Sequence, residues 1–270
     1  MARSCHKVLP YEAEIFSQMV DEDGLLIMGR HLGIHRLVRQ FVKLYSQPTS
    51  LVIVLNTSHE ERAMFIDSIA IDGDTPLLPK IITNECDAKR RSEIYLSGGV
   101  LFVTSRILVV DMLSAVVPIE SLSGFLVCNA QRVSEKSSEA FILRLFREKN
   151  KTGFIKAFTE SPSGMAHGFA QVQRLMKNLF VVNLFIWPRF HASVAASLTK
   201  HPVDVVELDI ELTEDMQTIQ TAILAIHSMC LQEIKRTVPG IEMDDLSLET
   251  GMAQSHLKYG SVVLYVVFVA

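Results

Sequence analysis

The sequence predicts an α/β fold, with a mostly parallel sheet flanked by helices and a mainly helical region after it. Short apolar runs alternate with stretches of helical periodicity up to residue 158, which is the pattern of a layered α/β domain. The run Leu51–Leu55 is continuously apolar rather than alternating, which indicates a strand buried on both faces of a parallel sheet. After Ser161–Gly164 the sequence changes to amphipathic helical spacing.

Each predicted strand is a short apolar run. The strands are expected at Leu25–Met28, Leu51–Leu55, Ile81–Thr83, Val100–Val103, Phe125–Cys128 and Phe154–Phe158. Between them, helices are predicted over Gly29–Tyr45, over Glu60–Ile69 after a Thr57 or Ser58 cap, from Thr104-Ser105 to Met112, and over Glu139–Lys149. The segment Lys89-Arg90-Arg91 lies beside Asp87 and Glu93 and is predicted to be a solvated loop.

The part of the chain after residue 163 is predicted to hold two helices. They are expected at 165–181 and at 214–236, the second with Thr213 as its N-cap and Glu214 and Asp215 in its first turn. Val203–Leu212 alternates apolar with acidic residues, which predicts an edge strand or an extended arm. We therefore place a domain boundary near residue 163.

Composition limits the function classes. The chain has 270 residues, 49% of them hydrophobic, and a net charge of −4. The high hydrophobic content excludes a disordered chain. The net charge disfavours a strongly basic polyanion-binding domain but allows a local basic patch. The four cysteines are far apart and the nine histidines show no metal spacing, so we predict no metal site. The longest apolar run, Val262–Ala270, is too short for a membrane span of about 20 residues.

The turn after the first predicted strand contains two glycines but departs from a phosphate-binding loop. That loop needs G-x-x-x-x-G-K-[ST], in which backbone N–H groups wrap the phosphates, Lys neutralises charge and the hydroxyl binds Mg²⁺. Gly29 and Gly33 are one residue too close, and His35 and Arg36 stand where Lys and Ser/Thr are needed. We interpret Gly29, Arg30, Gly33, His35 and Arg36 as a degenerate phosphate loop, and a nucleotide hydrolase with a non-standard loop stays open as an alternative.

The acidic motif that would complete a nucleotide hydrolase is also degenerate. A helicase-type core carries Asp-Glu-Ala-His after an apolar strand, where Asp holds Mg²⁺ and Glu activates water. Here the residues in those places are Cys128, Asn129, Ala130 and Gln131. Without the two carboxylates, the sheet is predicted to have the scaffold of a nucleotide hydrolase but not its catalytic residues.

Three segments carry a family resemblance. Thr104–Asp111, Glu139–Arg147 and Gly153–Thr159 resemble the N-terminal helicase-like module of the xeroderma pigmentosum group F (XPF) family of DNA repair endonucleases. Trp187–His191 and Asp245–Glu249 match as well, so the resemblance runs in order over roughly residues 8–249. It implies a RecA-like, degenerate superfamily 2 helicase fold, with a helicase-like domain without ATPase motifs at 1–163, a partial helical insert at 164–249 and a divergent tail at 250–270.

The resemblance implies a role in DNA repair. The chain would be the DNA-binding and scaffold-docking part of a structure-specific endonuclease of nucleotide excision repair and interstrand crosslink repair, located in the nucleus. Its expected partners are DNA with single-strand/double-strand junctions and a scaffold protein of crosslink repair. The sequence contains no Glu-Arg-Lys triplet of the family's nuclease motif, so we expect this polypeptide alone not to cut DNA.

The resemblance also bears on the cofactor, the family's smaller partner and the C-terminal tail. The family's Mg²⁺ would belong to the nuclease domain, so no cofactor is expected in this chain. The family's smaller obligate partner would lack its docking domain here. We interpret the tail after Glu249 as the mark of a truncated or alternatively spliced product, with a genuine terminal strand as the other interpretation. A non-functional truncated product is the third functional hypothesis.

Two groups of residues are candidates for DNA contact. Arg144, Arg147, Lys149, Lys151 and Lys156 form a basic cluster around a helix-to-strand loop, where they could neutralise phosphates; a solvated helix face is the alternative. Trp187, Arg189, Phe190 and His191 mix aromatic and cationic groups that could stack on bases. For Trp187, a buried anchor is the favoured interpretation.

The helix predicted at 214–236 carries an apolar stripe. Ile219, Ile223, Ile226 and Ile234 share one side, with Cys230 between them. The resemblance implies that this stripe is a docking face for the scaffold protein, and ordinary core packing is the alternative.

Overall fold

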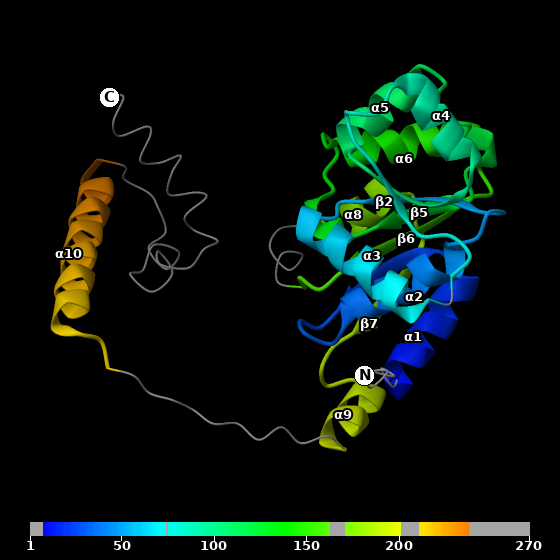
Figure 1. Ribbon diagram of the computed structural model, residues 1–270. Coiled ribbons are helices and arrows are strands. Elements are labelled where there is room, and N and C mark those ends of the chain that lie inside the picture. Colours follow the sequence, from blue (N-terminus) through cyan, green and yellow to red (C-terminus); the bar gives the residue numbers. More distant parts are fainter. Residues whose placement is uncertain (1–7, 74, 163–170, 201–210, 238–270) are drawn as a thin grey trace. The chain divides into compact units, whose positions relative to one another are not determined.

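The computed structural model describes residues 8–73, 75–162, 171–200 and 211–237. The chain divides into two units, residues 1–202 and residues 203–270, each of which is described by itself below. Figure 1 shows the elements of both units.

The first unit contains a seven-stranded parallel sheet. Its strands lie in the order β3-β4-β2-β5-β6-β1-β7, and every neighbouring pair is parallel. Their bounds are β1 Gly24–Met28, β2 Leu51–Leu55, β3 Lys80–Ile82, β4 Gly99–Val103, β5 Gly124–Val127, β6 Phe154–Thr159 and β7 Asn183–Trp187. The predicted fold class, a parallel sheet flanked by helices, is confirmed.

Helices cover both faces of this sheet (Figure 1). On one face, the core includes side chains of α1 Pro10–Asp21, α2 Ile34–Tyr45, α3 His59–Asp72 and α9 Ala192–Thr199. On the other face, it includes side chains of α4 Ala88–Leu96, α5 Ser105–Leu113, α6 Ser138–Lys149 and α8 Gln171–Leu179. Two short 3₁₀ turns, η1 Ile119–Ser121 and η2 Ala130–Arg132, flank β5.

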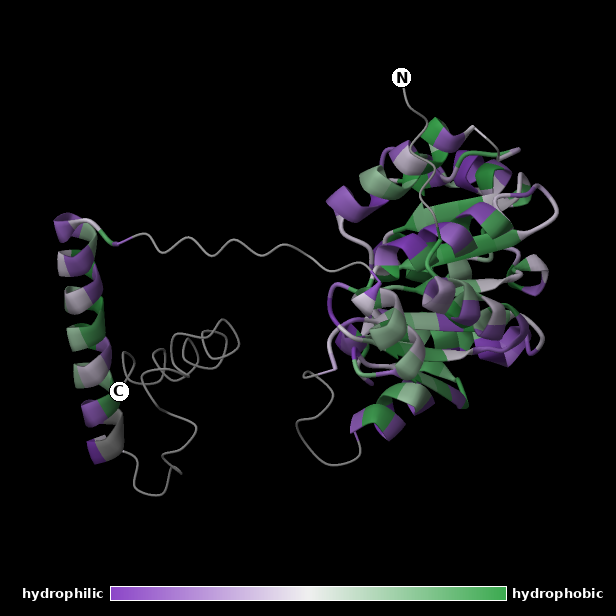
Figure 2. Cartoon of the chain, turned by 90° about the horizontal axis from the view of Figure 1, so that it is seen from below, coloured by the Kyte–Doolittle hydropathy of each residue, from purple (hydrophilic) through white to green (hydrophobic). Residues whose placement is uncertain are grey.

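The strands are continuously apolar because the sheet is buried on both sides. Every residue of β1, β2, β4 and β5 is buried, and their side chains alternate between the two cores. A strand with two covered faces has no polar face to alternate with. Figure 2 shows the resulting apolar layer between the more polar outer surfaces of the helices.

Helix boundaries follow local capping chemistry. Ser58 caps α3: its hydroxyl accepts from the backbone N–H of Glu61 at 3.1 Å, and the Glu61 carboxylate accepts from the N–H of Ser58 at 2.7 Å. Of the two predicted caps for this helix, the structure therefore selects Ser58 over Thr57. At α6, Ser137 accepts from the N–H of Ala140 at 3.3 Å.

Among the described α-helices and strands of the first unit, α1, α4, β7 and α9 were not predicted. The segment Lys89-Arg90-Arg91, predicted as a solvated loop, forms the first turn of α4 instead. This prediction was wrong because Arg91 pairs with Asp111, which is fully buried on α5. The local sequence around Arg91 does not indicate a partner twenty residues away.

The sheet extends past the boundary predicted near residue 163. β7 follows that boundary and pairs with β1 over five residue pairs, from Gly24↔Asn183 to Met28↔Trp187. As an edge strand it is only partly covered, with Leu184 and Ile186 exposed, so it lacks the fully apolar signature of the central strands.

The described part of the second unit is one helix. α10 spans Glu214–Thr237, in agreement with the prediction for 214–236, and the N–H of Met216 donates to the hydroxyl of Thr213 at 3.4 Å. The strand or arm predicted at Val203–Leu212 falls mostly on residues 203–210, which lie outside the described residues, and Glu211 and Leu212 belong to no strand. The tail at 250–270 also lies outside the described residues.

Candidate functional site

The degenerate phosphate loop lies at the carboxyl end of β1. Gly29 follows the strand and donates its N–H to the carbonyl of Trp187 at 2.9 Å, and Gly33 starts α2 with a positive φ of 89°. The carboxyl ends of parallel strands are where α/β sheets bind ligands, so the loop has the right place for a phosphate site. Its side chains, however, make contacts within the protein.

The carboxylate of Glu12 fills the space beside Gly33. Glu12 is 1% exposed, its Oε2 accepts from the N–H of Leu9 at 3.0 Å, and its Oε1 lies 2.5 Å from Nη2 of Arg36. A Cβ at Gly33 would come within 2.8 Å of the same Oε1. A negative charge thus stands at the start of α2, where a phosphate would otherwise meet the helix N-terminus, and it neutralises Arg36.

The other loop residues turn elsewhere. A Cβ at Gly29 would lie 3.4 Å from Cγ of Arg189, so the loop after β7 packs over this glycine. The carbonyl of Arg30 accepts from Nη2 of Arg189 at 3.0 Å, and the ring of His35 lies 6.1 Å from that of Phe65. The five predicted loop residues are therefore neighbours, but the contacts of Arg36 and His35 are internal ones.

The degenerate acidic motif ties loops of the carboxyl edge together. The amide nitrogen of Asn129 donates to the carbonyl of Asn56 at 3.1 Å and lies 3.3 Å from Oε1 of Glu61. Gln131 accepts from the hydroxyl of Thr159 at 2.8 Å, and Ala130 is fully buried. These contacts link the ends of β2, β5 and β6.

Cys128 supplies no reactive group to this motif. Its side chain is buried, and burial, with a smaller contribution from the nearby Glu61 carboxylate, strongly raises the pKa of its thiol. Because only the thiolate is a good nucleophile or metal ligand, Cys128 is inert near neutral pH. Among residues 8–73, 75–162, 171–200 and 211–237, no three His, Cys, Asp or Glu side chains gather as a metal site would require.

The predicted basic cluster surrounds the start of β6, at the amino edge of the sheet. Arg144, Lys149 and Lys151 are exposed there. Asn150 fixes the loop between them: its amide donates to the carbonyl of Leu122 at 2.8 Å, and its Oδ1 accepts from the N–H of Gly153 at 2.8 Å. The loop therefore presents the two lysines outward from a firm base.

Two members of the predicted cluster have structural partners instead. Lys156 is 1% exposed, and its Nζ donates to the carbonyl of Glu22 at 3.0 Å and lies 3.5 Å from Oδ1 of Asp23. Arg147 donates to the carbonyl of Gly153 at 2.5 Å and lies 3.6 Å from Oδ2 of Asp23. Lys156 is thus removed from the residues that can reach a phosphate, because its head group is enclosed by the chain.

Asp23 and Glu12 are the residues that pattern-based reasoning missed. Both are acids that take up predicted phosphate-binding cations: Glu12 that of Arg36, and Asp23 those of Lys156 and Arg147. The only sequence signals were Pro10 two positions before Glu12, typical of a helix start, and the place of Asp23 just before an apolar run.

The structure divides the aromatic and cationic group after β7. Trp187 is 4% exposed and packs in the core, as its interpretation as a buried anchor predicts, and the His191 ring lies 4.1 Å from the Trp187 ring. Phe190, in contrast, is 86% exposed. Arg189 and Phe190 therefore lie at the surface on the carboxyl edge, opposite the edge that carries Lys149 and Lys151.

The apolar stripe of α10 is exposed within the second unit. Ile219, Ile223 and Ile226 are each more than half exposed, while the side chain of Ile234 lies outside the described residues. A pocket of about 310 Å³ is lined by Leu212, Met216, Ile219, Gln220 and Ile223.

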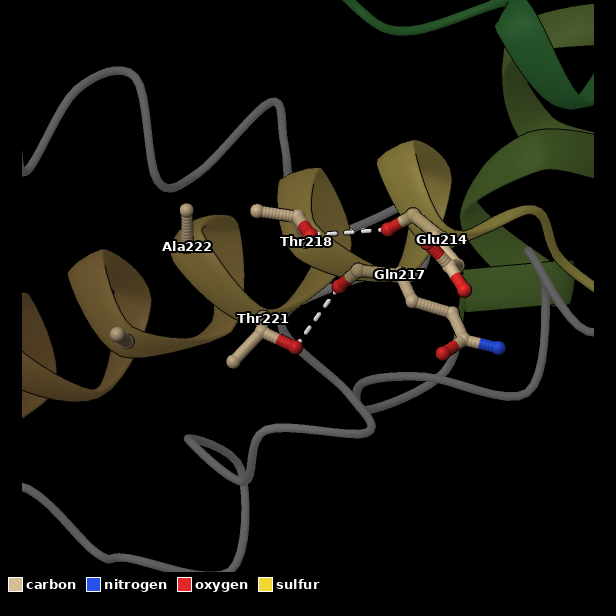
Figure 3. A pocket seen from close by; sticks show the side chains of 6 residues that line it. Glu214, Gln217, Thr218, Thr221 and Ala222 are labelled. Carbon is tan, nitrogen blue, oxygen red and sulfur yellow. Dashed lines mark hydrogen bonds between the residues drawn. The ribbon is translucent and has the colours of Figure 1, made fainter.

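A second, more polar pocket of about 570 Å³ lies against another face of α10 (Figure 3). The hydroxyls of Thr218 and Thr221 line it but bond back to the helix carbonyls of Glu214 and Gln217, at 2.9 and 2.8 Å. Their donor capacity is therefore used within the helix. Within the described parts of the chain, no helix is both long and apolar enough to span a membrane.

The amino-acid sequence is similar to those of known DNA repair proteins. The chain is 46% identical over 247 residues to DNA repair endonuclease XPF of Cricetulus griseus, 39% over 252 residues to that of Drosophila melanogaster, and 33% over 259 residues to DNA repair protein rad16 of Schizosaccharomyces pombe. These alignments cover 92–94% of this chain but only 25–29% of the relatives. The chain thus spans about a quarter of their length.

The fold also has a solved neighbour. The Hef helicase domain of Pyrococcus furiosus superposes with a TM-score of 0.66 at 15% identity, covering 95% of this chain and 53% of that one. At this identity, the likeness shows the fold alone. A scan against protein-family models matches none. In sequence the chain therefore matches part of the XPF family of DNA repair endonucleases, and in fold it matches a helicase domain.

Proposed function

We propose that this chain is the DNA-contacting, helicase-like part of a structure-specific DNA repair endonuclease. Its similarity to XPF along 92% of its length is the observation that carries the proposal. Within the wider protein it serves nucleotide excision repair and interstrand crosslink repair in the nucleus, on DNA that has single-strand/double-strand junctions. The domains 1–163, 164–249 and 250–270 remain our proposed division, with the sheet reaching into the second of them.

We further propose that Arg144, Lys149 and Lys151 contact DNA phosphates. All three are exposed: Arg144 lies on α6, and Lys149 and Lys151 flank Asn150, whose hydrogen bonds hold the loop backbone in place. Such contacts add affinity that depends on salt and reads no sequence.

The test is binding to splayed-arm DNA by fluorescence anisotropy at several salt concentrations. Each cation that neutralises a duplex phosphate steepens the plot of log affinity against log salt by about 0.9, so Lys149→Gln and Lys151→Gln should each flatten it by that amount. Lys89→Gln, an exposed lysine on α4, is the matched control and should leave the slope unchanged. Failure of the wild-type chain to bind junction, duplex or single-stranded DNA would remove DNA contact from the proposed function.

The exposed stripe of Ile219, Ile223 and Ile226 is our proposed docking face for the scaffold protein of crosslink repair. Three large apolar side chains in one row on a solvent-exposed helix favour a protein contact. Titration calorimetry with the purified scaffold should show that Ile223→Asp abolishes binding, whereas Gln217→Asp, on the polar face of the same helix, leaves it intact. Equal affinities for both variants would contradict the assignment.

The alternative, nucleotide hydrolysis through a non-standard loop, finds no support in the described residues. Glu12 fills the phosphate position and neutralises Arg36, and Asn129 and Gln131 occupy the acidic places.

A further inference from the structure

Phe190 is an exposed aromatic residue that the fold holds at a defined place. It follows β7 by three residues, and its neighbours on both sides are anchored: Trp187 is buried, and the N–H of His191 donates to the carbonyl of Pro188 at 3.0 Å. The Phe190 side chain itself is 86% exposed, against 37% and 40% for Phe141 and Phe180. A rigid turn therefore presents a ring to solvent.

Exposed arginines lie on the loop that carries Phe190 and on the loop beside it. Arg189 and Arg30 both lie at the surface, on the loops that follow the adjacent parallel strands β7 and β1. The bond from Nη2 of Arg189 to the carbonyl of Arg30, at 3.0 Å, joins the two loops. Further along the chain, the hydroxyl of Ser193 donates to the Glu14 carboxylate at 3.0 Å.

An exposed aromatic ring on a loop that also carries an exposed arginine is a combination that binds single-stranded nucleic acid. A base stacks on the ring whatever its sequence, and the cation neutralises an adjoining phosphate. The place, at the carboxyl edge of a parallel sheet, is also where such sheets take ligands.

We propose that Phe190 stacks on a base of single-stranded DNA, with Arg189 against an adjoining phosphate. The proposal builds on the proposed function, since it assumes that the chain contacts DNA. It adds a single-strand site at the carboxyl edge, separate from the duplex contacts of Lys149 and Lys151 at the amino edge.

The experiment compares variants of the full chain on a short fluorescent single strand and on the matching duplex. Phe190→Ala should weaken single-strand binding on the order of tenfold and change duplex binding little, because a paired base is not free to stack. Phe190→Trp should restore the affinity. Arg189→Gln should flatten the single-strand salt dependence by about 0.7 per lost phosphate contact. The matched control is Phe180→Ala, an exposed phenylalanine just before the opposite end of β7.

Two different failures can be told apart. If the wild-type chain binds DNA and Phe190→Ala binds the single strand as tightly as wild type, the stacking site is overturned and the proposed function stands. If the wild-type chain binds neither DNA, both fall. Thermal unfolding of each variant identifies any loss that comes from misfolding, and Phe190→Trp then decides the case, since a folded tryptophan variant without single-strand affinity also overturns the site.

Discussion

Nζ of Lys156 lies 3.5 Å from Oδ1 of Asp23, at the amino edge of the sheet, where the lysine joins β6 to the segment before β1. Its side chain is almost completely enclosed, and burial lowers the pKa of Lys156, an effect that Asp23 partly opposes. A lysine that looks like a phosphate contact in the sequence is therefore part of the framework.

Lys156→Met should lower stability without changing DNA binding. The variant leaves the carbonyl of Glu22 without its donor and the Asp23 carboxylate with Arg147 as its remaining cation, at a cost of about 1–3 kcal/mol in the free energy of unfolding. Chemical denaturation measures that loss. The salt dependence of DNA affinity, measured on the folded variant, should equal that of wild type, and a flatter slope would return Lys156 to the DNA-contacting set.

Arg91→Met should be among the most destabilising surface-accessible changes. Nη2 of Arg91 lies 2.7 Å from Oδ1 of Asp111, whose side chain is fully buried and also accepts from the Tyr95 hydroxyl at 2.9 Å. Removal of the guanidinium leaves a buried, uncompensated carboxylate, so we expect a loss of about 3–5 kcal/mol. Arg90→Met, next to it on α4 and exposed, is the control and should change stability by under about 0.5 kcal/mol.

The β1–α2 loop should bind no nucleotide while Glu12 fills it. ATP with magnesium is expected not to raise the Tm of the wild-type chain, because the loop already holds a negative charge. In Glu12→Gln, Arg36 loses its counter-charge, and phosphate should raise the Tm of that variant relative to equal ionic strength of chloride. The double variant Glu12→Gln/Arg36→Gln should lose this effect. A phosphate-dependent rise in the wild-type Tm would contradict the assignment.

Stability should fall as the solution becomes alkaline, in part through Tyr45. Burial, with a smaller effect from Asp23, raises the pKa of Tyr45 to about 12, and its ring lies 4.6 Å from that of Phe154. The unfolded tyrosine titrates near pH 10, so between about pH 10 and 12 the folded state binds more protons and stability falls with rising pH. Tyr45→Phe should therefore show a smaller stability loss over that interval in pH-dependent denaturation. An unchanged alkaline profile would speak against this cause.

The sequence by itself determined the layered sheet. Continuous apolar runs such as Leu51–Leu55 and Phe125–Val127 predicted central strands because a strand covered on both faces needs no polar side. Capping residues placed a helix start at Thr57 or Ser58, and the structure selected Ser58. The loss of the phosphate and acidic motifs was also readable, since those motifs depend on residue identity at fixed spacing.

Only the tertiary structure decided which basic side chains are free to contact a phosphate and which are held in internal ion pairs. Lys156 and Arg36 are paired by Asp23 and Glu12, acids that lie far from them in sequence, and Arg91 is paired by Asp111 from another helix. The edge strand β7 and the exposure of Phe190 were likewise set by what packs against them. The physical reason is the same in each case: burial and ion pairing depend on which segments the fold brings together, and local spacing carries no record of that.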